Sequence, residues 1–121
     1  MQVAVIGAGR FGSLHAVKLA AVPGVRVAAV VDLDPARAAA AAARVPGALA
    51  LTDLDALAPG VVAATVAVDV PRLAGVTARL LDRGLHVLAE KPLAMHADAA
   101  ERLQRLAERR GRVLAVGFVE R

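Results

Sequence analysis

The first 32 residues follow a pattern that very few folds accommodate. Residues 3–6 form a short apolar run typical of a strand, and they lead directly into Gly7, Gly9 and Gly12, spaced as G-x-G-x-x-G. A β-branched run over residues 25–31 follows and ends beside Asp32. Glycines between a strand and a helix, with an acid about 20 residues further on, predict a dinucleotide-binding loop.

Each part of this loop has a distinct physical role. Gly7 permits the tight turn after the strand, Gly9 lets a pyrophosphate approach the backbone, and Gly12 lets the following helix pack closely on the sheet. The start of that helix, at Arg10 and Phe11, offers unpaired N–H groups and a partial positive charge to phosphates. We therefore predict that residues 7 and 9–12 bind the cofactor.

Asp32 predicts which dinucleotide is bound. A carboxylate at the end of the second strand accepts hydrogen bonds from the adenosine ribose hydroxyls and repels a 2′-phosphate, which favours NAD over NADP. Arg37 follows closely and could reach a 2′-phosphate, although a surface arginine is the preferred interpretation. The alternative for the whole motif is a glycine-rich turn with Asp32 as an incidental helix cap.

The rest of the chain alternates between short apolar runs and helical stretches. Asp34 and Pro35 are suited to begin a helix, and Gly84 and Gly111 are suited to end one. Strands are expected over residues 3–6, 25–31, 48–51, 61–68, 85–89 and 113–117. Helices are expected over residues 11–21, 35 to about 45, 71–83 and 95 or 96 to 110, with a single helical turn over 53–57.

This alternation predicts an α/β fold. The strands are continuously apolar, as expected of a parallel sheet covered on both faces. Six strands in two βαβαβ halves fit a doubly wound Rossmann sheet of order 3-2-1-4-5-6. We expect one dinucleotide-binding domain over residues 1–121.

Composition excludes several other classes of protein. The absence of cysteine removes disulfides, thiolate metal sites and cysteine nucleophiles. The net charge of +4 comes from scattered arginines, and aromatic residues are nearly absent, so nucleic-acid binding is not expected. No apolar run is long enough to span a membrane, and a cytoplasmic protein is the default expectation.

The three histidines do not predict a metal site, because no two of them have metal-ligand spacing on one element. His15 is expected to pack or hydrogen-bond locally on the first helix. His86 is expected to be satisfied within its strand, and His96 to be exposed at a helix start. Ser13 could add a phosphate hydrogen bond but has no evident base beside it.

Glu90-Lys91-Pro92 follows the fifth predicted strand, at the sheet edge where doubly wound folds bind ligands. Lys91 is one of only two lysines in the chain. Near a nicotinamide it could hydrogen-bond a substrate hydroxyl and assist proton transfer, which makes it the candidate catalytic residue. A surface Lys–Glu pair is the alternative that the tripeptide alone leaves open.

The motifs together resemble one enzyme family. Residues 5–12 (VIGAGRFG), His15, residues 31–35 (VDLDP), residues 84–94 (GLHVLAEKPLA) and residues 116–118 (VGF) resemble the Gfo/Idh/MocA oxidoreductases. The resemblance implies NAD- or NADP-dependent oxidation or reduction of sugars, cyclitols and related compounds. It also implies that Lys91 contacts the nicotinamide region and substrate, while Glu90 and Pro92 shape that loop.

Three departures from the family pattern leave alternatives open, one of them that Thr65 precedes the loop after the fourth strand instead of standing in it. Members of the family normally continue into a second α/β domain that supplies the substrate pocket, and this chain stops at Arg121. We therefore expect weak or no turnover alone, and a homo-oligomer is an open alternative. Asp69 and Leu73 replace the family's usual residues after the fourth strand, which places a charge near the cofactor's route. A non-catalytic NAD-binding regulatory or scaffold module, or a degenerate fragment with a vacant site, is the competing interpretation.

Overall fold

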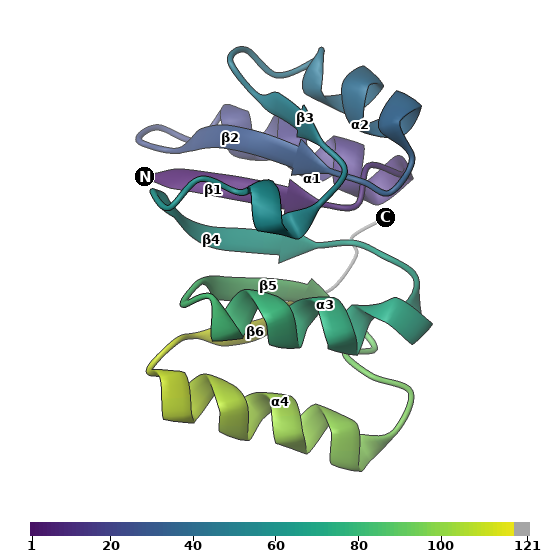
Figure 1. Cartoon of the computed structure of the whole chain (residues 1–121), viewed down its shortest axis with the longest axis vertical. Helices are drawn as coiled ribbons and strands as arrows, with labels where there is room; N and C mark the ends of the chain where they lie inside the picture. The colour runs from purple at the N-terminus through teal and green to yellow at the C-terminus, as the bar shows by residue number, and fades with distance from the viewer. Residues whose placement is uncertain (118–121) are drawn as a thin grey trace.

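The computed structural model describes residues 1–117 and contains one six-stranded parallel sheet of order β3-β2-β1-β4-β5-β6 (Figure 1). The predicted fold class and strand order are confirmed. The strands are β1 (Gln2–Ile6), β2 (Arg26–Val31), β3 (Leu49–Leu51), β4 (Val61–Val66), β5 (His86–Glu90) and β6 (Leu114–Gly117). The order reverses between β1 and β4, which is the position where doubly wound sheets open a crevice for ligands.

Four helices and one short 3₁₀ segment connect the strands: α1 (Arg10–Ala20), α2 (Pro35–Ala42), η1 (Leu54–Ala56), α3 (Val70–Asp82) and α4 (Ala97–Arg110). The predicted caps are present. The Asp34 carboxylate accepts a hydrogen bond from the Ala36 N–H at 2.9 Å, and Pro35 is the first residue of α2. Gly111 ends α4 in the left-handed conformation, with φ +64°.

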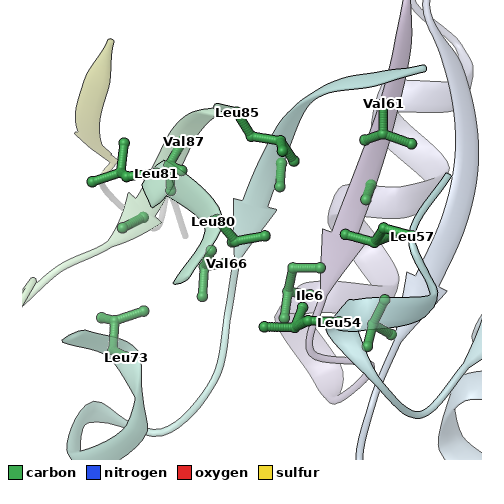
Figure 2. Packing of buried hydrophobic residues seen from close by; sticks show 14 of the residues in the cluster. Ile6, Leu54, Leu57, Val61, Val66, Leu73, Leu80, Leu81, Leu85 and Val87 are labelled. Atoms are coloured by element: carbon green, nitrogen blue, oxygen red, sulfur yellow. The ribbon is translucent and has the colours of Figure 1, made fainter. Parts of the chain in front are cut away.

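Two aliphatic cores lie on opposite faces of the sheet. One joins α1 and α2 to β1 and β2 through small residues such as Ala16 and Ala41. The larger core joins η1, α3 and α4 to the other face. Figure 2 shows the part of it that lies between η1, α3 and strands β1, β4 and β5. Leu73, Leu80 and Leu81 of α3 are each at most 1% exposed within it. Because both cores are closely packed against the sheet, they fix the positions of the strand ends from which the site loops begin.

Two strand boundaries differ from the prediction and shape the site. The predicted strand 61–68 ends earlier, at Val66, because the chain leaves the sheet after the Ala67 N–H donates to the Ile6 carbonyl at 2.8 Å. Residues 67–69 therefore form a loop at the sheet edge. Glu90 was expected in the loop after β5 but is the last residue of that strand, because it pairs with Gly117 of β6.

The side of β5 and β6 that lies on the α1 face is only partly covered within residues 1–117. Leu88 is 42% exposed there, and a shallow, mostly apolar cavity of about 300 Å³ lies among residues of β1, β4, β5 and β6. Within the part of the chain that the structure describes, no helix is long and apolar enough to cross a membrane.

Candidate cofactor-binding site

The glycine-rich loop links β1 to α1 at the carboxyl edge of the sheet. Gly7 has φ +99°, and its N–H donates to the Val31 carbonyl at 2.7 Å, which holds the loop against the end of β2. A Cβ atom at Gly7 would lie 2.4 Å from the Ala67 carbonyl oxygen. Both the backbone conformation and the space therefore require glycine at this position.

The space around the missing Cβ is filled at Gly12 and open at Gly9. A Cβ at Gly12 would lie 1.7 Å from the Gly7 carbonyl oxygen, so α1 can approach the loop only because that atom is absent. A Cβ at Gly9 would meet nothing within 4 Å. Gly9 is the N-cap of α1 and makes no side-chain capping bond, so the first N–H groups of the helix lie beside this open space. The space and the donors fit a phosphate group.

Asp32 is held firmly at the end of β2. Its Oδ2 accepts from the Ala8 N–H at 2.7 Å, and its Oδ1 accepts from the Asp34 N–H at 2.8 Å and from Arg37 Nη2 at 3.2 Å. A carboxylate has about four acceptor positions, so one remains for a further donor such as a ribose hydroxyl. The residue is 8% exposed, and its remaining surface borders the cavities described below.

The hydrogen bonds also keep Asp32 ionised. Burial raises the pKa of Asp32, but the bonds from the Ala8 and Asp34 N–H groups and from Arg37 outweigh burial, so the pKa falls below its ordinary value of 3.8. A lowered native pKa means that the ionised group stabilises the fold above pH 3.8 and loses this effect as the pH falls through the lowered value. The carboxylate is therefore charged, and able to accept, at neutral pH.

Two adjoining cavities open above this loop. The smaller, about 290 Å³, is bordered by Gly7, Gly9, Asp32 and Asp69 among other residues, and so brings together four of the predicted site residues. The larger, about 870 Å³, extends from Gly7 and Asp32 toward η1 and α3 and has a mostly aliphatic lining. Together they form a cleft of the size that small-molecule and cofactor sites usually have.

Two arginines, of which only Arg37 was expected near this site, pair with its carboxylates. Arg37 is half exposed, borders the smaller cavity and pairs with Asp32, so its interpretation as an ordinary surface residue was incomplete. Asp69 pairs with Arg72 at 2.5 Å, and Arg72 borders both cavities. The Asp69 charge that raised doubt about cofactor binding is thus compensated. The i,i+3 spacing of Asp69 and Arg72 could have indicated this pair from sequence.

The remaining predicted residues are placed at different distances from the cleft. Arg10 and Phe11 lie in the first turn of α1 and Gly12 beneath the loop, and none of the three borders either cavity. Lys91 and Pro92 follow β5, two strands from β1, and their peptide bond is cis. The cleft also uses residues that sequence reasoning missed because they come from other loops and from α3: Leu33, Thr52, Asp53, Val68, Pro71, Gly75, Val76 and Arg79.

The histidines divide between confirmed and corrected expectations. His86 Nδ1 accepts from the Val113 N–H at 3.0 Å, so it is satisfied at the sheet, and His96 is exposed at the start of α4. His15 does not interact locally: its Nε2 lies 3.0 Å from Glu90 Oε1 of β5. The Ser13 hydroxyl lies 3.1 Å from the Ala8 carbonyl. Within residues 1–117, no group of three or more His, Cys, Asp or Glu residues is arranged to hold a metal ion.

The fold and the glycine-loop cleft define a dinucleotide-binding α/β domain, and comparison with known proteins places it in a family. The family described as "Oxidoreductase family, NAD-binding Rossmann fold" (GFO_IDH_MocA) matches residues 1–118. The chain therefore belongs to the Gfo/Idh/MocA oxidoreductases and is their NAD-binding Rossmann domain. The predicted family and cofactor class are confirmed. Phe118, one residue of the resemblance, lies outside the described residues.

Individual relatives are dehydrogenases and reductases. Inositol 2-dehydrogenase of Arthrobacter sp. (strain FB24) is 42% identical over 126 residues, which cover all of this chain and 37% of the relative. GenD2 from gentamicin A biosynthesis, solved in complex with NAD, is 34% identical with a TM-score of 0.92 and covers 97% of this chain and 34% of that one. KijD10, a 3-ketoreductase from Actinomadura kijaniata solved with NADP and TDP-benzene, is 32% identical with a TM-score of 0.88, over 97% and 37% of the two chains. The chain thus spans little more than a third of the length of these relatives.

Proposed function

We propose that this chain is the cofactor-holding part of an NAD-dependent oxidoreductase that acts on a sugar- or cyclitol-like alcohol or its carbonyl form. The observation that carries the proposal is the arrangement around the smaller cavity. There, an open backbone position at Gly9 and the Asp32 carboxylate border the same space. The names of the relatives support the substrate class.

The residues suit the successive parts of a dinucleotide. The N–H groups at the start of α1 would hold the pyrophosphate over Gly9, and Asp32 would accept from the adenosine ribose. The larger cavity offers the apolar surface of Leu33, Leu54 and Val76 for the adenine. Arg37, beside Asp32, is balanced by that carboxylate, so the local charge does not single out a 2′-phosphate. NAD remains the preferred cofactor.

Lys91 is the proposed catalytic residue. The bound nicotinamide supplies hydride transfer to or from a carbon of the substrate. Lys91 would donate a hydrogen bond to the reacting oxygen and help move its proton. Its place after β5, at the same sheet edge as the glycine loop, supports this role. The relatives are nearly three times as long as this chain. We therefore propose that residues 1–121 form only part of the substrate pocket and that a second domain or chain completes it.

The test is turnover by these residues together with the second domain or chain that completes the pocket, in the presence of NAD⁺ and a panel of polyols and sugars headed by inositol. Lys91→Ala is expected to lower kcat/KM by roughly 10²–10⁴-fold, the usual range for a general acid–base group, with NADH affinity unchanged. Lys18→Ala, at the chain's other lysine on an exposed position of α1, is the matched control and should match wild type. Equal kcat/KM for Lys91→Ala and wild type would contradict the role.

The second candidate is a non-catalytic NAD-binding module with a regulatory or scaffold role. Its support was Asp69 and Leu73, but Asp69 is paired with Arg72 and Leu73 is 1% exposed in the core, so neither spoils the site. A vacant, degenerate fragment is disfavoured by the open Gly9 position. Tight NADH binding without turnover of any substrate, in wild type and in complex with candidate partners, would favour the non-catalytic module.

A further inference from the structure

The contact between His15 and Glu90 links the two loops that the proposed reaction needs. His15 Nε2 lies 3.0 Å from Glu90 Oε1, and the two side chains are 27% and 14% exposed. His15 lies on α1, one turn after the glycine-rich loop, and Glu90 is the last residue of β5 and is bonded directly to Lys91. The pair therefore connects the helix that would hold the phosphates to the residue that would act on the substrate.

The pair contributes less to stability than a pair whose polar atoms are all hydrogen-bonded. His15 Nδ1 and Glu90 Oε2 are both buried and have no hydrogen-bond partner among residues 1–117. A buried polar atom without a partner within the protein adds nothing to stability, so the pair rests on its one contact. The contact thus orients each side chain, while the second polar atom of each has no hydrogen-bond partner in the described part of the chain. Such an arrangement is understandable where position matters more than stability.

The chemistry of the pair fixes the orientation of both partners. An ionised Glu90 accepts but cannot donate, so Nε2 of His15 carries the proton of the contact. The bond from Nε2 to Glu90 holds the imidazole of His15 in one orientation. Since Glu90 is also paired through its backbone with Gly117, the end of β5 is held from two sides immediately before Lys91.

We propose that His15 is a positioning residue that acts through Glu90 to fix Lys91 relative to the glycine-rich loop. The inference rests on the proposed role of Lys91 and adds a residue to it. Misplacement of a reacting group by about 1 Å can lower a rate by roughly 10²-fold, so loss of the pair should reduce kcat while leaving nucleotide affinity nearly unchanged.

The experiment uses the fact that the chain has only two lysines. Protein labelled with [ε-¹³C]lysine gives two signals, of which Lys91 reports the loop and Lys18 serves as internal reference. His15→Ala and Glu90→Ala are each expected to shift the Lys91 signal, with and without NADH, and the double variant should shift it no further than either single variant. His15→Gln, whose amide can still donate to Glu90, should restore the signal toward wild type.

The outcomes separate this inference from the proposed function. If folded His15→Ala or folded Glu90→Ala leaves the Lys91 signal at the wild-type position, the positioning role is overturned, whatever happens to melting temperature. Glu90→Ala removes the acceptor of the contact, so it provides a reading even if His15→Ala does not fold. If the Lys91 signal moves as expected but Lys91→Ala retains full kcat, the pair positions Lys91 and the proposed catalytic role fails instead.

Discussion

Replacing Gly12 with alanine is expected to lower the free energy of unfolding by about 3 kcal/mol, at the upper end of the range for overpacking. The added Cβ would lie 1.7 Å from the Gly7 carbonyl oxygen, which is backbone and cannot rotate away. Either α1 moves outward from the sheet or the glycine loop shifts, and both movements disturb the core around Ala16. Urea unfolding followed by circular dichroism measures the loss.

Gly75→Ala is the matched control for this prediction. Gly75 lies inside α3, and a Cβ there would meet nothing within 4 Å. The substitution should stabilise the protein by about 1 kcal/mol, because alanine favours the helix more than glycine does. The same chemical change should thus have opposite signs at the two positions. A Gly12→Ala variant as stable as wild type would show that α1 does not pack on the loop as described.

Replacing Gly9 with leucine is expected to lower NADH affinity roughly 100-fold while the fold survives. Gly9 has φ −74°, which any residue can adopt, and open space surrounds its missing Cβ. Leucine is a poorer N-cap than glycine and should cost only about 1 kcal/mol of stability. Its side chain would, however, occupy the space where we place the pyrophosphate, and each tenfold loss of affinity corresponds to about 1.4 kcal/mol.

Fluorescence titration of NADH measures this effect, and Gly9→Ala supplies a graded comparison. A single methyl group should weaken binding less than leucine does, since it fills less of the space. Wild-type affinity in folded Gly9→Leu would mean that the nucleotide does not cross the loop at this point. Together, the Gly12 and Gly9 variants separate a glycine needed for packing from a glycine needed for binding.

The sequence predicted the sheet because its signals are local. Each strand is a continuous apolar run, each helix has its own start and stop residues, and the chain-order alternation leaves few topologies. The positions of the glycine loop and Asp32 were predictable for the same reason, since they come directly after β1 and β2. Strand ends were less predictable, because the neighbouring strands determine where the pairing stops. Val68 is apolar but lies beyond the last paired residue of β4.

The contacts that sequence did not predict join distant segments. The partner of His15 is on β5, and nothing around His15 in the sequence distinguishes a residue with a distant partner from one that packs locally. The larger cavity similarly draws on the loops after β2 and β3 and on α3, whose side chains meet only after the sheet has formed. Arg37 was considered as a phosphate ligand or a surface residue, but its pairing with Asp32 depends on the curve of the chain into α2.

A titration of the ¹⁵N-labelled protein with NADH, and separately with NADPH, tests most directly whether this cleft holds NAD. The amide signals of Gly9 and Arg10, beside the proposed pyrophosphate position, and those of Leu33 and Asp34, beside the ribose, should shift together with one dissociation constant. NADH should saturate them at a lower concentration than NADPH. Unchanged signals at these four positions, shifts confined to the β5–β6 face, or tighter binding of NADPH would contradict the account.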